Sequence, residues 1–549
     1  MSNIRLLPKC IHSVLPGFIA VGAAALSAPF ALDAAILPAP PQTFDASYET
    51  PSGHTIAVNA NGDLQAALNH AQLGDTIILQ AGATFTGPFT LPNKTSGSGW
   101  IYVQSSSYLK LPTPGVRVSP SDAPNMPVIV SPDHGNAIVT VSGSHHFRFA
   151  GIEFKTAANT YTVNVVQLDN NDKSPSTLTH HITFDRCYFV ADTSIGVRRG
   201  LLGNAAYLAV LDSYFSGFRE HGADSQAIVA FNTSGPIKIV NNYLSGAGEN
   251  LMFGGADSAD VSLIPSDIEV RGNYFFKPLS WLGSTWVVKN LLEFKDTRRA
   301  LVTGNVFENN WLAAQQGFSL LVTPRNDGGT APWTVTEDIA ITNNRFINIG
   351  SGISVAGADS VHTSQHTARV LIKNNLLSVN GLNGAHGWAF MILDSPSEVT
   401  VDHNSIFSTS AFMEAENAAG KPMTNNFTFI NNILVSPSGL IGSGTGPGLD
   451  ALKTYFSNWT MIGNALTSGP AAAYPKGNYF PASITDIRFT NAPAGDYSLA
   501  NNSPYRAAGT DGRDLGADMA SIPIAAGDTT SRAADGTVIP DAPKALQVK

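Results

Sequence analysis

The chain is poor in charge and in cysteine, and each shortage argues against a class of protein. Charged residues make up 13% of its 549 residues, against about 25% in typical soluble proteins. The formal net charge is -9, and no basic run occurs beyond the N-terminus, which argues against a nucleic-acid partner. Only two cysteines are present, Cys10 and Cys187. A disulfide framework is therefore not expected, and packing and hydrogen bonds have to hold the fold.

The N-terminus has the pattern of an export signal. Arg5 and Lys9 precede an apolar stretch rich in small residues, Ile11–Ala35, which is typical of a cleaved signal peptide. An uncleaved anchor helix is the alternative interpretation. We expect residues 1–35 to be removed, leaving a secreted or periplasmic protein without membrane association. Cys187 then remains as the one cysteine of the mature chain, and we interpret it as a small buried residue.

The chain does contain a recurring sequence motif: alternating apolar residues, then two polar or small residues, then a further apolar residue. It occurs eleven times between Phe147 and Leu466, for example as IKIVNNYL at Ile237–Leu244. The steps between copies run from 26 to 39 residues. The sixth position is asparagine in the last eight copies: Asn242, Asn273, Asn305, Asn344, Asn375, Asn404, Asn432 and Asn464. A period of this length predicts a solenoid, in which each turn buries what the previous turn leaves exposed.

Alternation within one period predicts three short strands per turn. Asparagine tolerates left-handed backbone, so the Asn pair predicts a tight bend between the first two strands, and stacked Asn side chains can bond one another. Residues 55–520 are predicted to form the solenoid, with about 11–13 turns. Helical spacing of apolar residues in Gly62–Ala71 predicts a helix that covers the first turn. We interpret residues 36–54 as a linker, the segment after Asn501 as a closing cap and residues 521–549 as a tail.

The Asn-bearing bend, the period of about 30 residues and the N-terminal capping helix resemble the pectin-lyase-like superfamily. The resemblance covers roughly residues 55–520 and implies an all-β, right-handed parallel β-helix, which we expect to be a monomer. It implies less about activity, because that fold carries lyases, hydrolases, isomerases, esterases and tailspikes. The RxPxxR and vWiDH motifs of pectate lyases are absent, as is the NTD, DD and GHG set of polygalacturonase-like hydrolases.

Function on such a fold has to lie on outward positions of one face, and the third strand of each turn lies beside the variable loops. If Leu292 and Phe294 point inward, alternation puts Glu293 and Lys295 outward. On the next turn the same register brings Arg325 to the end of the strand. Neighbouring turns are about 5 Å apart, so these charges form one candidate site. A solvated ladder of ion pairs is the alternative.

The resemblance implies β-elimination on a uronic-acid polymer, in which a base removes the proton next to the carboxylate. We predict Lys295 as the base, on the hypothesis that Arg298 and Arg299 beside it lower its pKa. These two arginines are also predicted to bind substrate. Arg325 is expected to neutralise the substrate carboxylate, and Glu293 to orient Lys295 or to help hold an ion.

The only cofactor that this chemistry suggests is Ca²⁺, for which Glu249, Asp257 and Glu293 offer oxygen ligands. Their spacing follows no dedicated metal-binding loop. The same carboxylates allow a second enzymatic reading, because glycoside hydrolysis needs two carboxyl groups flanking one bond. Glu249 or Asp257 with Glu293 is the nearest such pair.

Aromatic residues in the loops suggest contacts with sugar rings. Trp281, Trp286 and Trp333 are candidate stacking platforms for a polysaccharide, and His221 lies in a loop that borders the proposed groove. Covering the apolar stack is the alternative role of the tryptophans. The pairs His145-His146 and His180-His181 precede repeat strands and are interpreted as turn residues. A non-catalytic carbohydrate-binding or surface-adhesion protein is the rival to a lyase or a hydrolase.

Overall fold

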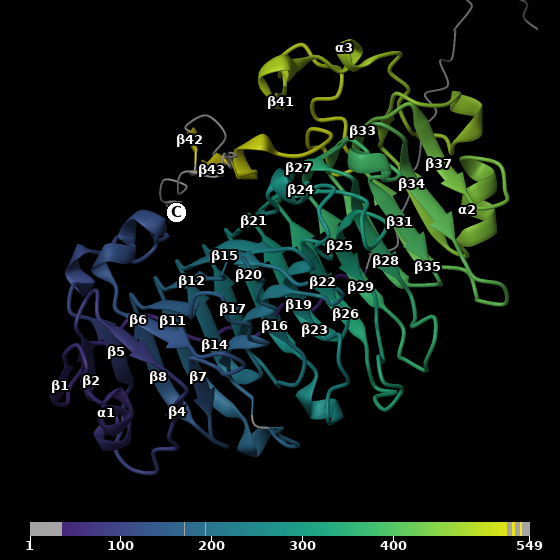
Figure 1. Ribbon diagram of the computed structural model, residues 1–549. Helices are drawn as coiled ribbons and strands as arrows, with labels where there is room; N and C mark the ends of the chain where they lie inside the picture. Colours follow the sequence, from purple (N-terminus) through teal and green to yellow (C-terminus); the bar gives the residue numbers. More distant parts are fainter. Residues whose placement is uncertain (1–35, 170, 193, 524–529, 533–537, 541–549) are drawn as a thin grey trace, which may run out of the picture. The chain divides into compact units, whose positions relative to one another are not determined.

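The computed structural model describes residues 36–169, 171–192, 194–523, 530–532 and 538–540. The predicted export signal, residues 1–35, lies outside them. Nearly all strands belong to three sheets in which every neighbouring pair is parallel. From β2 to β39, successive strands of the chain join the first, the second and the third sheet in turn, so three strands make one turn of a coil (Figure 1). Among the described residues, no helix is both long and apolar enough to span a membrane.

The first sheet has 14 strands: β1 Thr55–Val58, β2 Thr76–Leu79, β5 Ile101–Ser105, β8 His145–Ala150, β11 Thr179–Asp185, β14 Ala205–Leu211, β17 Ile237–Val240, β20 Ser266–Arg271, β23 Thr297–Thr303, β26 Thr336–Thr342, β29 Ala368–Lys373, β32 Ser397–Asp402, β35 Asn425–Ile430 and β38 Trp459–Ile462. The second sheet has 13: β3 Thr84–Thr86, β6 Val128–Ser131, β9 Glu153–Thr156, β12 Tyr188–Val190, β15 Tyr214–Phe218, β18 Tyr243–Gly246, β21 Tyr274–Phe276, β24 Val306–Asn310, β27 Arg345–Ile349, β30 Leu376–Val379, β33 Ser405–Ser408, β36 Ile433–Val435 and β39 Ala465–Leu466. The third sheet has 12: β4 Phe89–Leu91, β7 Ile138–Thr140, β10 Asn164–Gln167, β13 Arg199–Leu202, β16 Gln226–Ala230, β19 Glu249–Phe253, β22 Leu292–Phe294, β25 Phe318–Val322, β28 Ser351–Ala356, β31 Phe390–Leu393, β34 Ala411–Glu416 and β37 Ser438–Gly442. These numbers agree with the predicted 11–13 turns.

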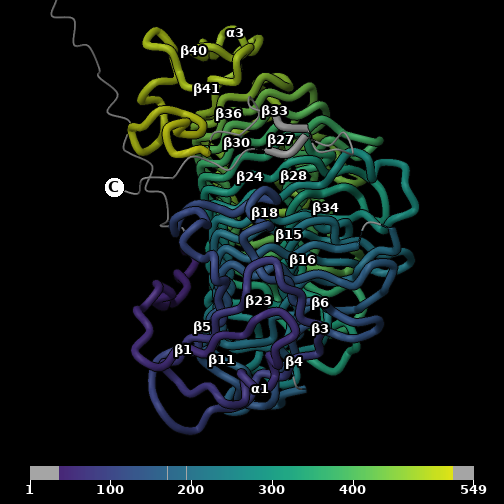
Figure 2. The backbone as a smooth tube through the Cα atoms, turned by 60° about the vertical axis from the view of Figure 1, so that its left-hand side comes forward, coloured from purple at the N-terminus to yellow at the C-terminus, as the bar shows by residue number. Residues whose placement is uncertain are grey.

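The remaining elements are short and lie outside the three sheets. Besides short 3₁₀ turns, the described residues form the α-helices α1 Leu64–His70, α2 Leu449–Tyr455 and α3 Ile484–Ile487. Two antiparallel pairs join β40 Phe489–Asn491 with β41 Asp496–Leu499 and β42 Thr530–Arg532 with β43 Val538–Pro540. Figure 2 shows α1 at the purple end of the coil and α3 with β40 and β41 at the yellow end.

The interior of the coil is filled by apolar side chains from alternate positions of all three sheets. Equivalent residues of successive turns stack on one another, because parallel register places each side chain above its counterpart. The rings of Phe275 and Phe307 have centroids 4.5 Å apart, and those of Phe307 and Phe346 are 4.6 Å apart. Each turn therefore covers the apolar surface of the one before it, as predicted.

The predicted asparagine bend forms a continuous hydrogen-bonded ladder. Asn242 donates from its backbone N and its Nδ2 to Oδ1 of Asn273, at 2.8 and 3.0 Å. The same pair of bonds links Asn273 to Asn305 and continues through each following copy to Asn464. The residue before the ladder position is left-handed, with φ of 55° at Asn241. Cys187 occupies an earlier ladder position and is buried, which raises the pKa of its thiol to about 12.

Helix α1 confirms the predicted N-terminal cap. The carboxylate of Asp63 accepts a hydrogen bond from Ala66 N at 2.9 Å, which satisfies one free N–H of the first helical turn. Leu64, Ala67 and Leu68 are buried, and α1 contacts β1 and β4. The helix thus covers apolar surface that the first turns leave open.

The segment predicted as a linker is bound along the outer face of the first sheet. We call residues 36–49 the N-terminal strap. Ala39 N donates to Oδ1 of Asp338 on β26, and Gln42 N donates to Oδ1 of Asp267 on β20, both at 2.8 Å. Further along, the Glu49 carbonyl accepts from the Tyr102 hydroxyl on β5 at 2.7 Å. Ten extended residues span about 34 Å, which matches the seven strand spacings between β26 and β5, also about 34 Å.

The C-terminal segment expected to close the coil instead runs back along its side. Gly516 N donates to the Asn431 carbonyl, and Asp518 N donates to Oδ1 of Asn374, two turns earlier. Leu499, Tyr505 and Leu515 pack with Ile433 and Ala465 on the outside of the second sheet. Bend residues of the coil, Asn431 and Asn374, thus supply the hydrogen-bond acceptors for this segment.

Candidate functional site

Alternation puts Glu293 and Lys295 on the outer face of the third sheet, as predicted. Leu292 and Phe294 belong to the apolar core, so the residues between and after them face outward. Nζ of Lys295 is 2.8 Å from Oε2 of Glu293. The side chain of Glu293 is completely buried and that of Lys295 is 17% exposed. The pair is therefore sheltered by the loops of this face and is not a solvated ion pair.

Neighbouring turns add three polar side chains, which with Glu293 and Lys295 we call the third-sheet cluster. They are Arg199 on β13, Gln226 on β16 and Glu249 on β19. Arg199 Nε donates to Gln226 Oε1 at 2.9 Å, and Gln226 Nε2 donates to Glu249 Oε2 at 2.7 Å. The other oxygen of Glu249, Oε1, has no hydrogen-bond donor within the described part of the chain. A buried carboxylate is thus only half satisfied.

Two further charges border the cluster. Nζ of Lys289 is 4.0 Å from Oε1 of Glu249, but it is bound more closely to Asp224, at 2.6 Å from Oδ1. The fully buried Lys277 donates from Nζ to the carbonyls of Gly246, Ala247 and Gly248, at 2.6, 2.8 and 3.1 Å. None of these lysines, nor Arg199 and Gln226, was predicted, because loops and other turns bring them to the site.

Burial shifts the acid–base chemistry of the cluster toward neutral pH. Burial, with the nearby negative charge of Glu293, raises the pKa of Glu249 to about 7. Burial lowers the pKa of Lys277 to about 7, although Glu249 and Glu293 partly oppose the change. Burial also lowers the pKa of Arg199 to about 10. Glu249 is therefore a carboxyl group that exchanges a proton near neutral pH, which general acid–base catalysis requires.

The predicted pKa of Lys295 is wrong. Burial alone lowers the pKa of its ammonium, but the carboxylates of Glu293 and Glu249 outweigh burial and raise that pKa above its ordinary value. Arg298 and Arg299, expected to lower it, lie on β23 of the first sheet. There Arg299 donates from Nε and Nη2 to Asp267 at 2.7 and 2.8 Å. Lys295 thus stays protonated at neutral pH and is suited to bind an anion rather than to accept a proton.

One flank of the cluster carries two of the predicted aromatic residues and His221. The imidazole of His221 stacks on Trp286, with ring centroids 3.7 Å apart. Arg219 lies over the same tryptophan at 4.8 Å. Trp281 is buried against Ala247 and its neighbours, whereas Trp286 is half-buried and His221 is exposed. Trp286 and His221 are thus accessible to a sugar, and Trp281 supports the loop.

The opposite flank holds Arg325, Asp257 and Trp333 in contacts within the loops. Arg325 Nη1 is 2.7 Å from Oδ1 of Asp359. Asp257 accepts from Gly328 N and Thr330 N, at 3.0 and 2.9 Å. Trp333 Nε1 donates to the hydroxyl of Ser258 at 3.0 Å. These contacts position the loop that follows β25, so Asp257 already uses its carboxylate to hold backbone N–H groups.

The carboxylates proposed as Ca²⁺ ligands do not fit one ion. Glu249 begins the five-residue strand β19 and Asp257 follows its far end, so the strand alone separates them by roughly 13 Å. Glu293 is engaged by the ammonium of Lys295. Calcium needs six to eight oxygens within about 2.6 Å, and these residues do not supply them together.

A cavity of about 640 Å³ lies elsewhere, between the C-terminal segment and the bends of the coil. Its walls include Lys373, His403, Arg506 and Asp514. It contains none of the predicted site residues. Charges of both signs line it, and Asp402 engages His403 and Lys373, so this cavity shows no preference for an anionic sugar.

No protein-family model and no curated protein sequence matches the chain. Solved structures do match. The PL6 family alginate lyase AlyGC is 16% identical, aligns with 86% of the chain and gives a TM-score of 0.51. The likeness confirms the predicted fold, a right-handed parallel β-helix. The chain spans 58% of the length of that alginate lyase.

Two more solved structures are similar to this parallel β-helix. A mannuronic-acid-specific family 6 polysaccharide lyase from human gut microbiota is 11% identical, with 78% of this chain and 91% of the other aligned and a TM-score of 0.48. The catalytic unit of a GH87 α-1,3-glucanase from Streptomyces thermodiastaticus strain HF3-3 is 13% identical, with 80% and 71% aligned and a TM-score of 0.46. At such identities the likeness shows the fold alone.

Proposed function

We propose that this parallel β-helix is an exported polysaccharide lyase that cleaves a uronic-acid-containing polymer by β-elimination at the third-sheet cluster. The observation that carries the proposal is the sheltered group of Glu249, Glu293 and Lys295, in which one carboxyl group titrates near neutral pH beside a fixed ammonium. The similarity in fold to an alginate lyase supports a uronate polymer as the first substrate to test.

The roles of the residues follow from their charges. Lys295, held by Glu293, pairs with the substrate carboxylate and stabilises the negative charge that develops on it. Glu249 takes the proton next to that carboxylate, the carbon–carbon double bond forms, and the glycosidic C–O bond breaks. The proton on Glu249 can then be returned to the leaving oxygen. Glu249 is fully buried, so proton transfer requires one bridging water or an opening of the loops around Trp286.

Trp286, His221 and Trp333 are proposed as sugar contacts along the two flanks, and Arg325 as a further contact to substrate carboxylates. Arg298 and Arg299 contribute only if the polymer extends to the first sheet. Ca²⁺ has no assigned step. The active form is proposed to be monomeric and to act outside the cytoplasm, after removal of residues 1–35.

A glycoside hydrolase is the second candidate. Glu249, whose pKa is raised, lies near a second carboxyl group, Glu293, and such enzymes use one carboxyl group as acid and the other as base or nucleophile. A non-catalytic carbohydrate-binding protein is the third, and it makes no use of the titrating carboxyl group.

One assay separates the three. The purified protein is incubated with pectin, alginate and a glycosaminoglycan, with added Ca²⁺ and with a chelator. A rise in the absorbance of unsaturated uronates supports the lyase. New reducing ends without that absorbance favour hydrolysis. Binding of a polymer with neither signal rejects both enzymes and supports the binding protein.

A further inference from the structure

Four histidines that neither the fold nor the proposed reaction uses lie together on the outer face of the first sheet. His145 and His146 begin β8, and His180 and His181 lie near the start of β11. The two pairs are 35 residues apart, which is the first step of the repeat, and His180 is the register partner of His145. We call these four residues the histidine cluster.

The backbone at the two pairs brings all four rings to one side of the sheet. Neighbouring residues of a strand normally point to opposite faces. His146 and His181 instead have φ of 57° and 54°, a left-handed conformation that is uncommon outside glycine and asparagine. As a result the two Nδ1 atoms of each pair share a hydrogen bond, 2.7 Å long in the first pair and 2.8 Å long in the second. The same arrangement recurs on both turns.

The rings are fixed by stacking. His145 lies parallel to His180, with centroids 4.9 Å apart, and His146 lies parallel to His181 at 4.4 Å. Trp100 packs edge-on against His146 on one side of this column, and Tyr207 stacks on His181 at 4.3 Å on the other. All four histidines are half-buried. A site fixed in this way loses little side-chain entropy when it binds a ligand.

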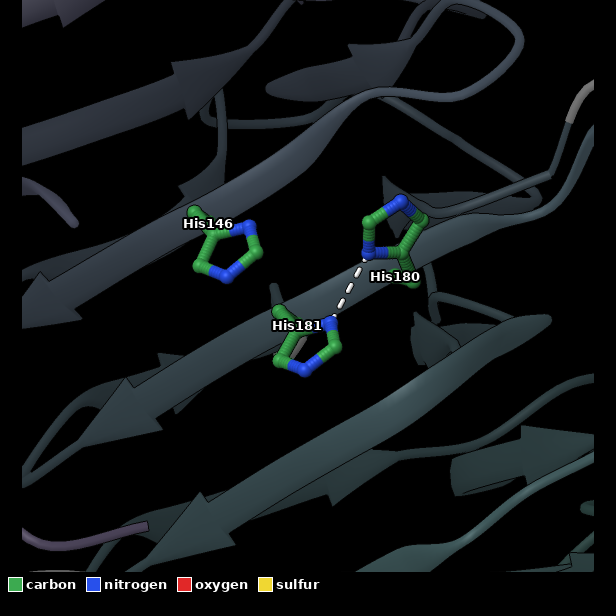
Figure 3. Close-up of side chains that lie close together, drawn as sticks. All are labelled: His146, His180 and His181. Atoms are coloured by element: carbon green, nitrogen blue, oxygen red, sulfur yellow. Dashed lines mark hydrogen bonds between the residues drawn. The ribbon is translucent and has the colours of Figure 1, made fainter. Parts of the chain in front are cut away.

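Imidazole nitrogens in this number are typical ligands of late first-row transition metals. One ligand nitrogen from each of His146, His180 and His181 lies within 4.8 Å of the others, as Figure 3 shows for the three rings. A neutral imidazole offers such an ion the lone pair of one ring nitrogen.

We propose that the histidine cluster binds one divalent transition-metal ion through His146, His180 and His181. The Nδ1 atoms of His180 and His181 are 2.8 Å apart in a hydrogen bond, so an ion that binds both nitrogens has to displace the hydrogen between them. With metal–nitrogen bonds of about 2.0–2.1 Å, that separation gives an angle of about 90° at the shared ion. A right angle matches the square or tetragonal geometry of Cu²⁺ and Ni²⁺ better than the tetrahedral geometry of Zn²⁺. The ring of His146 has to approach, because two nitrogens on one ion are at most about 4.2 Å apart.

The bound ion would join two successive turns of the coil. Nε2 of His145 contacts the Lys94 carbonyl at 2.8 Å, so that nitrogen carries its hydrogen, and His145 acts as a support for the ring of His180. From the general order of metal affinities, we expect the site to bind Cu²⁺ more tightly than Ni²⁺. The site is independent of the third-sheet cluster and is proposed whether or not the protein is a lyase.

The test uses the mature protein without a polyhistidine tag, stripped of metal by a chelator and titrated with Cu²⁺ or Ni²⁺ alone in a calorimeter. We expect one saturable equivalent of Cu²⁺ with a dissociation constant in the micromolar range or below, and nitrogen hyperfine structure in its electron paramagnetic resonance spectrum. His180→Phe keeps the stack on His145 and is expected to weaken binding at least tenfold. The matched control His386→Phe, at a ring that stacks on Trp388, should leave the affinity unchanged.

No saturable equivalent in the unaltered protein, or an unchanged affinity in His180→Phe, rejects the site. Circular dichroism and the melting temperature of each variant show whether it is folded. If His180→Phe does not fold, His146→Asn replaces it, since asparagine tolerates the left-handed backbone at that position. It is expected to weaken Cu²⁺ binding by a similar factor, and unchanged binding rejects the proposal.

Discussion

The outer faces of the first and third sheets both carry buried carboxylates, but these carboxylates differ in the number of partners that they have. On the first sheet Asp185 is bound by two arginines, with Arg148 Nη2 at 2.9 Å and Arg186 Nε at 2.7 Å. These contacts outweigh burial and keep the pKa of Asp185 below its ordinary value. On the third sheet Glu249 has one donor, Gln226, and one unsatisfied oxygen, and its pKa is raised.

This difference separates a structural ion pair from a reactive group. A buried carboxylate that is bound by two cations stays ionised at neutral pH, and the ion pairs stabilise the fold. A buried carboxylate left half satisfied costs stability, and natural proteins tolerate that cost mainly at functional sites. The contrast leads to four predictions, each of which tests one of the two faces.

The largest expected effect is on turnover. Lys295→Ala removes the ammonium that balances the substrate carboxylate, and we expect the rate of uronate release to fall about a thousandfold. The matched control is Arg271→Gln on the first sheet, whose arginine pairs with Glu269 far from the third-sheet cluster in the fold. If absorbance shows equal activity for Lys295→Ala and the unaltered protein, the active site does not lie at the third-sheet cluster.

The second prediction concerns the paired face. Asp185→Asn leaves two buried guanidinium groups without their carboxylate, and we expect the free energy of unfolding at neutral pH to fall by about 3–5 kcal/mol. The folded-state pKa of Asp185 is lowered, so its stabilising contribution is present above the ordinary pKa of an aspartate and is lost as the pH falls through the folded value. The deficit should therefore shrink in acid. Denaturant unfolding at several pH values measures it, and a deficit independent of pH would contradict the argument.

The third prediction has the opposite sign. The folded-state pKa of Glu249 is raised from 4.5 to about 7, so its contribution is fully present below about pH 4.5 and is lost as the pH rises through about 7. Glu249→Gln keeps the acceptor for Gln226 and removes the charge. We expect it to be about 3 kcal/mol more stable than the unaltered protein at pH 8 and equally stable at pH 4, while losing turnover. A loss of stability at pH 8 would show that the carboxylate is needed for folding.

The smallest effect is expected where the first sheet holds the N-terminal strap. Asp338→Asn weakens the bond to Ala39 N and the ion pair with Arg369, at a cost of about 1 kcal/mol. Limited proteolysis should then cut within residues 36–49 sooner, while the coil stays intact. Unchanged cleavage would mean that Gln42 and Glu49 hold the strap by themselves.

The fold could be predicted from the sequence because a short motif determines each turn and recurs in every turn. Each copy of the motif fixes which residues point inward, and one asparagine per turn marks the bend. That register also put Glu293 and Lys295 on the correct face. The histidine cluster was within reach of the same reasoning, since its two pairs are one repeat apart, but single residues at strand starts resemble turn residues.

The composition of the site could not be predicted, because neighbours in sequence separate at each corner of the coil. Lys295 directly follows β22 of the third sheet, and Arg298 and Arg299, three and four residues later, already belong to β23 of the first sheet. Lys277 and Lys289 arrive from a loop whose path the repeat does not determine. The raised pKa of Lys295 follows first from Glu293, two residues earlier in the sequence, and then from Glu249 on the preceding turn. Only the three-dimensional fold shows that these carboxylates together outweigh burial.

The N-terminal strap also bears on the order in which the molecule folds. Ala39 bonds to Asp338, 299 residues later in the chain, and contacts of such sequence separation form slowly, because the intervening chain has to be ordered first. During synthesis residues 36–49 stay without partners until β20 and β26 exist. Residues 36–49 are therefore among the last to take up their places. The coil can form turn by turn, but the N-terminal strap binds along it only after most of the turns have formed.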